Sequence, residues 1–207
     1  MSARSGRIIP FAILLLAAAP VLADHKPGPP PPPGMVQQLR AGGLVLYLRH
    51  AMTERKAEAE PIDLDACSAQ RNLNDEGRDA ARRIGREMKR LGIRVGEVRA
   101  SPFCRTRETA YLAFGAVLSD PALLSGGNPK DKAELARLPD LAKLLSTPPP
   151  GAGTNTVLVG HSGLLDSLTR VHLDEAEMAV FKPLGRGKYA FIARIRAEHW
   201  AGLVAPR

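Results

Sequence analysis

The stretch Leu44-Val-Leu-Tyr-Leu48 is a continuous apolar run, and it is followed directly by Arg49-His50. A short apolar run without alternation is typical of a strand that is buried on both faces of a sheet. A second run of this kind, Thr156-Val-Leu-Val159, is followed by Gly160-His161. We therefore expect two buried strands, each with a histidine at its carboxyl end.

The segments around these runs have the features of helices and further strands. The stretch from Asn74 to about Leu91 has apolar residues at helical spacing, Asn74 can cap its start, and Gly92 can end it. Two further helices are expected over residues 105–117 and 131–145, and two further strands over residues 95–100 and 189–195. Strands that alternate with helices predict an α/β fold with a doubly wound, mostly parallel sheet flanked by helices.

Polar residues stand where three of the predicted strands end. Arg49-His50 follows the first strand, Ser101-Pro102 follows the second, and His161-Ser162 follows the third. In open α/β sheets the ligand binds outside the carboxyl ends of the strands. We therefore expect Arg49, His50 and His161 in one pocket, together with Arg105, which lies just beyond Ser101-Pro102.

This set of residues suits the chemistry of a phosphoryl group. The guanidinium groups of Arg49 and Arg105 are rigid forks of donors that match phosphate oxygens and offset their charge. A neutral imidazole, held by a partner on its other nitrogen, can attack phosphorus and form a phosphohistidine. A second imidazole, when protonated, adds positive charge beside the phosphate oxygens. This chemistry requires neither a metal nor a cofactor, and we expect neither.

Four segments, in order along the chain, resemble the signature motifs of the histidine phosphatase superfamily. Their order and spacing agree from about Leu44 to Gly163, which is most of the mature domain. The segments are Leu48-Arg49-His50-Ala51 followed by Thr53, Leu73-Asn74-Asp75-Glu76-Gly77-Arg78, Ser101-Pro102-Phe103-Cys104-Arg105-Thr106 continued by Glu108-Thr109-Ala110, and Val157–Gly163. The resemblance implies a phosphoglycerate mutase-like fold in a small exported, bacterial-type member that lacks the long insertions of the phytase-like branch.

The resemblance also implies a role for each of the four residues. His50 would be the nucleophile, Arg49 and Arg105 would bind the phosphoryl oxygens, and His161 would complete the pocket. The activity it implies is a metal-independent phosphohydrolase that acts on a small phosphomonoester or phosphoramidate through a phosphohistidine. The physiological substrate and the oligomeric state follow neither from the residues nor from the resemblance.

The sequence departs from the superfamily at the general acid. Many members have a His-Asp pair at the second histidine, or a glutamate in a segment after the second arginine. Here His161 precedes Ser162, and residues 123–132 lack the glutamate. The candidates that remain are Glu54, Asp63, Glu108 and Glu134, or no acid at all.

Two alternatives on the same fold remain, and the missing acid motivates the first of them. One is a catalytically inactive module that only binds a phosphate ligand. The other is a phosphoryl mutase, which we disfavour because the acidic segment of mutases is absent and export would separate the enzyme from cytoplasmic sugar phosphates. A good leaving group, such as that of a phosphoramidate, needs little help from an acid, so the hydrolase remains our prediction.

The N-terminal residues have the composition of a targeting segment. Arg4 and Arg7 precede an apolar run that two prolines interrupt, and Ala23 ends an Ala-x-Ala-like cleavage site. We predict a signal peptide over residues 1–23, a proline-rich spacer over 24–35, and the folded domain over 36–207. The apolar run is short for a membrane span. We therefore expect an exported protein, periplasmic or secreted, with no stable span after cleavage.

The formal charge of +8 over 207 residues falls to +6 without residues 1–23, which carry two arginines and no acid. A basic excess suggests an anionic partner. The densest basic stretch, residues 78–90, has helical spacing with acidic residues interspersed and no aromatic pattern for stacking bases. We therefore expect a solvated helix face and no nucleic-acid partner, and a small phosphorylated substrate as the anion.

Three residue types outside the main set allow other interpretations. Cys67 and Cys104 can form a disulfide in an oxidising compartment, which would tether the segment that carries Arg105. Gly160-His-Ser-Gly163 has part of the pattern of a serine-hydrolase elbow, but the position two residues after Ser162 is Leu164 rather than glycine. The histidines at positions 25, 172 and 199 lie outside any motif, and we interpret them as structural or solvated.

Overall fold

The computed structural model describes residues 29–58, 60–125 and 132–204. The predicted signal peptide and residues 24–28 of the predicted spacer lie outside this part of the chain. The folded part begins with α1 at Met35. Within the described ranges, no helix has both the length and the hydropathy needed to cross a bilayer.

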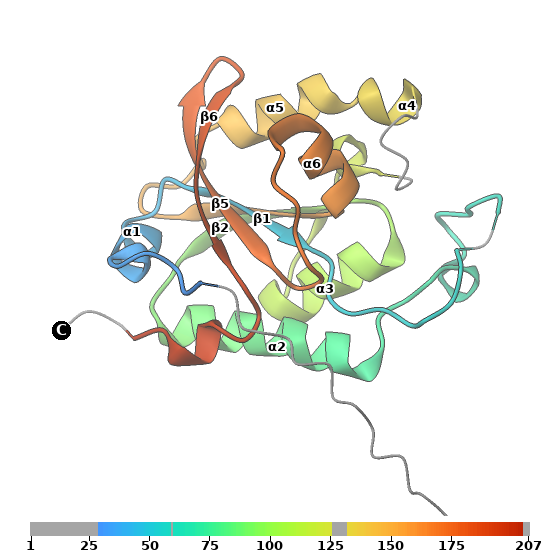
Figure 1. Ribbon diagram of the computed structural model, residues 1–207, viewed down its shortest axis with the longest axis horizontal. Helices are drawn as coiled ribbons and strands as arrows, with labels where there is room; N and C mark the ends of the chain where they lie inside the picture. The colour runs from blue at the N-terminus through green and yellow to red at the C-terminus, as the bar shows by residue number, and fades with distance from the viewer. Residues whose placement is uncertain (1–28, 59, 126–131, 205–207) are drawn as a thin grey trace, which may run out of the picture.

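A six-stranded sheet forms the centre of the fold, in the order β3-β2-β4-β1-β5-β6, with helices on both faces (Figure 1). The strands are β1 (Val45–Arg49), β2 (Val95–Ala100), β3 (Leu118–Ser119), β4 (Asn155–Gly160), β5 (Met178–Gly185) and β6 (Lys188–Ile195). The α-helices are α1 (Met35–Ala41), α2 (Asp75–Arg90), α3 (Cys104–Phe114), α4 (Lys132–Leu135), α5 (Leu138–Ser146) and α6 (Ser162–Thr169).

The α/β fold with a flanked, mostly parallel sheet is confirmed. The strands β3, β2, β4 and β1 pair in parallel, while β5 runs antiparallel to β1 and to β6. In Figure 1, α2 and α3 lie on one side of the sheet, and α4, α5 and α6 lie on the other.

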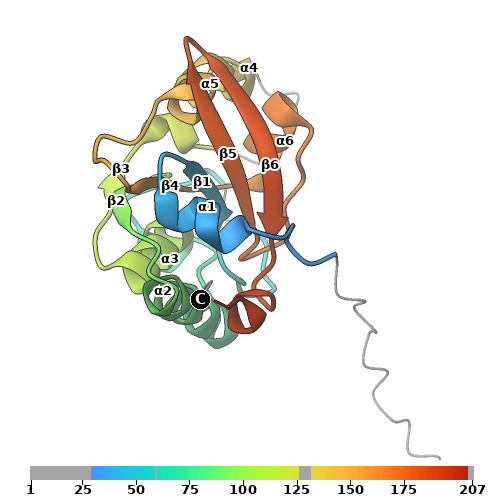
Figure 2. The same ribbon diagram turned by 90° about the vertical axis from the view of Figure 1, so that its left-hand side faces the viewer.

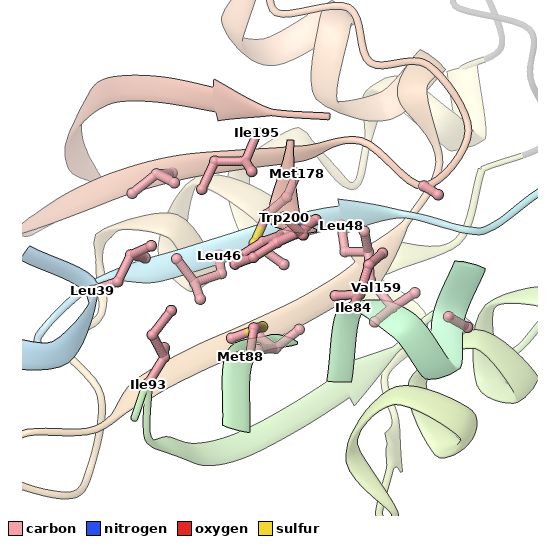
Figure 3. Close-up of a cluster of buried hydrophobic side chains, with 14 of the residues drawn as sticks. Leu39, Leu46, Leu48, Ile84, Met88, Ile93, Val159, Met178, Ile195 and Trp200 are labelled. Carbon is pink, nitrogen blue, oxygen red and sulfur yellow. The ribbon is translucent and has the colours of Figure 1, made fainter. Parts of the chain in front are cut away.

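The central strand β1 is apolar on both faces because each face supports its own core. Leu46 and Leu48 belong to the core cluster that contains Ile84 and Met88 of α2, whereas Val45 and Tyr47 belong to the cluster under α5 and α6. Figure 3 shows the first cluster, in which Trp200 from the C-terminal segment packs with the strand residues. A doubly covered strand has no solvent face, which explains its unbroken apolar run.

The predicted helix α2 begins and ends as its sequence indicates. The side chain of Asn74 accepts a hydrogen bond from the backbone N–H of Gly77 (2.8 Å), which satisfies one of the free donors of the first turn. After Arg90 the chain turns at Gly92, whose φ is +71°.

Two predicted helices have different bounds in the structure. The helix expected over residues 105–117 ends at Phe114, because Gly115 takes a left-handed conformation with φ 76°. The stretch expected as one helix over residues 131–145 contains two, α4 and α5. Pro139 lies at the start of α5, where its missing N–H and fixed φ favour a new first turn over continuation of α4.

Four of the α-helices and strands were not predicted from the sequence: α1, β3, α6 and β5. In β5, Met178–Phe181 pairs with β1 on one side and with β6 on the other, whereas the residues beyond Phe181 pair with β6 alone. Pro183 lies in this second part, where one edge of the strand is free of a partner. A proline argues against a strand in the sequence, so β5 was not predicted. In the structure, β5 and β6 form a long hairpin (Figure 2).

Candidate active site

The carboxyl ends of β1, β2 and β4 lie at the same edge of the sheet. Arg49 is level with Gly160 in the parallel register, and Ala100 is level with Val159. The pairing continues one residue further, because the backbone N–H of His50 donates to the carbonyl of Gly160 (3.0 Å). The predicted convergence of the three strand ends is therefore present.

The four predicted residues Arg49, His50, Arg105 and His161 line one cavity of about 550 Å³. The other residues that line it come from the loop after β1, from the start of α3, from the segment before α4, and from the α6 region. They are Lys56, Ala57, Glu58, Glu60, Ile62, Arg71, Phe103, Ser125, Ser162, Gly163, Asp166 and His172.

The imidazole of His50 is buried and has one nitrogen occupied. Its Nδ1 lies 2.9 Å from the carbonyl oxygen of Ala51. Because a carbonyl only accepts hydrogen bonds, Nδ1 carries the proton and Nε2 has a free lone pair. Burial, followed by the charges of Arg105 and Arg49, lowers the pKa of His50 to about 3, against the opposing effect of the Ala51 hydrogen bond. His50 is therefore a neutral imidazole at neutral pH.

Helix α3 fixes the backbone next to His50. The hydroxyl of Thr109 accepts a hydrogen bond from the backbone N–H of Ala51 (3.0 Å) and donates to the carbonyl of Arg105 (2.7 Å). One threonine thus connects the histidine segment to the helix that carries the second arginine. This contact gives a physical reason for Glu108-Thr109-Ala110 in the motif.

His161 is held from both its ring and its backbone. Its Nε2 lies 2.9 Å from the hydroxyl of Ser101, and its backbone N–H and carbonyl both bond to the hydroxyl of the buried Tyr47. A Cβ at Gly160 would lie 2.1 Å from that hydroxyl oxygen, so this position requires glycine. Burial, then the positive charge of neighbouring groups, lowers the pKa of His161 well below its usual value. Its ring centroid lies 5.5 Å from that of His50.

Arg49 and Arg105 each have a carboxylate near the guanidinium. Arg49 donates to the carbonyl of Leu173 (2.8 Å) and lies 3.8 Å from a carboxylate oxygen of Glu175. Arg105 is only 5 % exposed, and its Nη1 donates to Glu58 Oε2 (2.6 Å). Burial lowers the pKa of both arginines, although a guanidinium remains charged at any neutral pH.

One donor of Arg105 has no acceptor. Its Nε is buried and makes no hydrogen bond within the described part of the chain. The guanidinium carbon lies 4.1 Å from the centroid of the Phe103 ring, which fixes the plane of the group. An unpaired buried donor carries a free-energy cost that an anionic ligand would remove.

The motif Leu73–Arg78 positions the start of α2 against the segment after His50. The backbone N–H of Asn74 donates to the carbonyl of Met52 (3.1 Å). A Cβ at Gly77 would lie 2.0 Å from that same carbonyl oxygen, so only glycine permits the approach. The motif is therefore structural: it holds the chain that follows the nucleophile candidate.

A disulfide joins Cys67 to Cys104, the residue before Arg105. It tethers the loop over residues 52–73 to the first turn of α3. Beside it, the side-chain oxygen of Gln70 accepts a hydrogen bond from the backbone N–H of Cys104 (2.9 Å). The loop therefore forms a wall of the cavity at a fixed place relative to Arg105.

None of the four predicted general acids lines the cavity. Glu54 pairs with Lys56 (3.0 Å), Glu108 pairs with Arg78 (2.7 Å), and Asp63 accepts hydrogen bonds from backbone N–H groups within its own turn. Glu134 is fully buried behind the cavity wall, where its carboxylate accepts a hydrogen bond from the hydroxyl of Ser125 (2.9 Å).

The carboxylate that does line the cavity beside the arginines is Glu58, which was not among the predicted acids. Arg71 was missed in the same way. Both residues lie in the loop over residues 52–73, which contains no strand, and Ala59 within it is not described. The disulfide candidate was the only sequence signal that this loop meets Arg105.

His172, which was predicted to be structural or solvated, lines the cavity with a side chain that is 66 % exposed. Its Nδ1 lies 3.2 Å from the hydroxyl of Ser162 and 3.9 Å from a carboxylate oxygen of Asp166. A serine-hydrolase triad needs the serine and the acid on opposite ring nitrogens. Both partners of His172 face the same nitrogen, so the geometry does not support a Ser162 nucleophile. His199 lies away from the cavity, and His25 lies outside the described residues.

Comparisons with known proteins agree with the motifs and the fold. The model of the histidine phosphatase superfamily (branch 1) matches residues 45–123. No curated protein matches the chain. In the part of the chain that the structure describes, no group of three histidine, cysteine or acidic side chains is arranged to hold a metal ion.

Solved structures with a similar fold have low sequence identity to the chain. The protein histidine phosphatase SixA complexed with tungstate is 16 % identical, with a TM-score of 0.53, over 74 % of this chain and 97 % of that one. Phosphoserine phosphatase from Entamoeba histolytica in complex with 3-phosphoglyceric acid is 13 % identical, with a TM-score of 0.54, over 76 % and 98 %. A putative alpha-ribazole-5'-P phosphatase from Escherichia coli K-12 is 15 % identical, with a TM-score of 0.54, over 75 % and 98 %.

Proposed function

We propose that the chain is a member of the histidine phosphatase superfamily and a phosphohydrolase that works through a phosphohistidine on His50. The observation that carries the proposal is the state of His50: a buried, neutral imidazole whose Nδ1 is occupied by Ala51. Its free Nε2 shares the cavity with Arg49 and Arg105. The family match supports the same class of activity, and the named phosphatases of similar fold are consistent with it.

In the first step, Nε2 of His50 attacks phosphorus and forms a P–N bond. The P–O or P–N bond to the leaving group breaks, and the electron pair departs with the leaving atom, which takes up a proton. In the second step, water attacks the phosphohistidine, the P–N bond breaks, and inorganic phosphate forms. The electron pair returns to Nε2, and the proton of the water passes to a base in the cavity.

The arginines and His161 stabilise the charge of the transferred group. Arg49 and Arg105 provide guanidinium donors, and the unpaired Nε of Arg105 gains an acceptor when a phosphoryl oxygen binds. The neutral His161 donates through whichever ring nitrogen carries its proton. A bound phosphate dianion favours protonation of this imidazole, which would add a further positive charge.

We propose Glu58 as the proton donor to the leaving group. Its carboxylate lines the cavity and bonds to Arg105 at 2.6 Å, so it stands beside the place where the phosphoryl oxygens would bind. When a phosphate dianion takes its place on Arg105, Glu58 loses a cation and gains an anionic neighbour. In its protonated form, the Glu58 carboxyl group can give its proton to the departing oxygen.

The substrate in this proposal is a small phosphomonoester or phosphoramidate. The inactive binding module was motivated by the lack of an acid in the sequence motifs. Glu58 removes this reason for the binding module. It places a carboxylate in the cavity, although it belongs to none of the sequence motifs. We therefore retain the hydrolase alone.

We also propose that the protein is exported, after cleavage of residues 1–23. The composition of those residues supports it, as does the Cys67–Cys104 disulfide, since such bonds persist mainly in oxidising compartments.

The hydrolysis of 4-nitrophenyl phosphate by the purified protein in excess EDTA tests the proposed activity. We expect turnover by the wild type and a loss of about 10³-fold or more in kcat for His50→Ala, because the nucleophile is removed. His199→Ala is the matched control, since His199 lies outside the cavity, and it should keep the wild-type rate. An inactive wild type across several phosphomonoesters and phosphoramidates, or a fully active His50→Ala protein, would overturn the proposal.

A further inference from the structure

Three arginines line the cavity, and only two of them have a carboxylate partner. Arg105 is bonded to Glu58 and Arg49 lies near Glu175. No carboxylate among the described residues lies within 4.0 Å of the guanidinium of Arg71. Arg71 thus brings a positive charge to the cavity without a direct ion pair among the described residues.

The guanidinium of Arg71 is held at the cavity by a neutral contact. Its Nη1 donates to the hydroxyl of Thr53 (3.0 Å), which itself donates to Glu175 (2.9 Å). A guanidinium has five N–H donors, and this hydrogen bond uses one of them. The side chain is therefore oriented, yet most of its donors are open to a ligand.

The backbone at Arg71 is fixed on both sides. Its own N–H donates to Glu58 Oε1 (2.8 Å), and Leu73 forms an antiparallel bridge with Thr53. On the other side, Gln70 and the Cys67–Cys104 disulfide attach the same loop to α3. A charged side chain on such a fixed backbone loses little conformational entropy when it binds an anion.

The position of Arg71 relative to the phosphoryl site follows from Glu58. One oxygen of this carboxylate accepts from the Arg105 guanidinium, and the other accepts from the Arg71 backbone. Burial is the main cause of the lowered pKa of Arg49, Arg105, His50 and His161, and the charge of Arg71 lowers all four further. Arg71 is thus near the reacting group but on the loop side of it.

The other charges of the cavity wall limit where a second anion could bind. Glu60 and Asp166 also line the cavity, and Asp166 lies beside His172. Lys56 already pairs with Glu54. An anion is favoured on the Arg71 side and disfavoured on the Asp166 side by simple charge repulsion.

We propose that Arg71 binds a second anionic group of the substrate, a carboxylate or a second phosphoryl group, a few bonds from the phosphoryl group that is transferred. This inference rests on the proposed function and names its substrate class. The four predicted residues already provide two guanidinium groups and two imidazoles for one phosphoryl group. Arg71 is then a specificity residue, which selects the substrate without touching the reacting atoms.

Two matched pairs of substrates separate the second anion from the rest of the molecule. 3-Phosphoglycerate and glycerol 1-phosphate differ at one end by a carboxylate in place of a hydroxymethyl group. Fructose 1,6-bisphosphate and fructose 6-phosphate differ by a second phosphoryl group. We expect the wild type to prefer the more anionic member of at least one pair by about 10-fold or more in kcat/KM. The pair in which this preference is found shows whether the second anion is a carboxylate or a phosphoryl group.

The variant Arg71→Gln should remove that preference. Its kcat/KM should fall about 10- to 100-fold for the more anionic member of the pair, and much less for the other member. Arg71→Lys keeps the charge and should restore part of the preference. Arg55→Gln, an exposed arginine of the same loop, is the control that should leave it unchanged.

Two results would overturn the inference while leaving the proposed function intact. One is a wild type that hydrolyses 4-nitrophenyl phosphate but prefers neither anionic member. The other is an Arg71→Gln protein that loses activity equally on both members of a pair, since Arg71 would then act on the transferred phosphoryl group. A wild type that is inactive on 4-nitrophenyl phosphate as well as on all four substrates would remove both proposals.

Discussion

The cavity has two walls that differ in how the chain places them. The strand-end wall consists of Arg49, His50, Arg105 and His161. Arg49 ends β1, His50 and His161 directly follow β1 and β4, and Arg105 lies in the first turn of α3. Parallel pairing fixes this wall, because a register between strands fixes where each strand ends. The loop wall consists of Glu58 and Arg71, within residues 52–73. A disulfide and side-chain hydrogen bonds fix that wall instead.

The two walls also differ in burial and in the part they play. His50, Arg105 and His161 are almost fully buried, whereas Arg49 in the same wall and Glu58 and Arg71 in the loop wall are partly exposed. Burial removes water from the transferred phosphoryl group and strengthens every charge interaction there. We infer that the strand-end wall performs the phosphoryl transfer, and that the loop wall supplies the leaving-group proton and selects the substrate. Substitutions in the strand-end wall should therefore lower the rate for every substrate. Substitutions in the loop wall should have effects that depend on the leaving group or on the substrate.

The largest effect is expected at Arg105, which belongs to the strand-end wall. Arg105→Ala should lower kcat/KM about 10³-fold for every phosphate ester, because each needs the same charge on the transferred group. Steady-state rates on 4-nitrophenyl phosphate and glycerol 1-phosphate measure this. Arg107→Ala, an exposed neighbour on the same helix, is the control. A loss confined to one type of substrate would mean that the distinction between the two walls is wrong.

An intermediate effect is expected at Glu58, and it should depend on the leaving group. Glu58→Gln should lower kcat about 10²-fold for an alkyl phosphate such as glycerol 1-phosphate, because an alkoxide must be protonated as it departs. 4-Nitrophenolate is stable without a proton, so that ester should be affected far less. Glu60→Gln is the control, as Glu60 lines the cavity without a bond to Arg105. Equal losses for both esters would exclude Glu58 as the donor and leave it a role in binding only.

The smallest effect on turnover of 4-nitrophenyl phosphate is expected from loss of the disulfide. The double variant Cys67→Ser/Cys104→Ser should be less stable by about 4 kcal/mol according to the chain-entropy model, which urea unfolding measures. Below its unfolding range, it should show a raised KM for the preferred anionic substrate, because Arg71 and Glu58 lose their tether. Two titratable thiols in the unreduced, denatured wild type would show that the bond does not form. A collapse of kcat on 4-nitrophenyl phosphate would show that the strand-end wall also depends on it.

The strand-end wall could be predicted from the sequence because its geometry follows from general rules. Leu44–Leu48 and Thr156–Val159 are unbroken apolar runs, and their parallel pairing brings the next residues, His50 and His161, to one edge. The glycines at positions 77 and 160 have close approaches that explain why the motifs contain them. Local pattern and pairing thus account for the centre of the site.

The loop wall could not be predicted, because its path has no repeating backbone pattern. Glu58 reaches Arg105 across 47 positions of the chain, and only the folded loop brings the two together. His172 was missed for a similar reason, since α6 and the turn after it were not predicted. The general acids proposed from the sequence were chosen by proximity to motifs, and Glu54 and Glu108 pair with basic residues outside the cavity instead.

The most direct test of the central claim is to trap the phosphoryl group on the enzyme. The protein is mixed with labelled 4-nitrophenyl phosphate, quenched by denaturation, and mapped by peptide mass spectrometry. We predict up to one phosphoryl group per chain on His50, stable in base and labile in acid, and none in His50→Ala. A catalytically active wild type that yields no phosphoenzyme under rapid quench, or one labelled at Ser162 by an acid-stable bond, would contradict the account.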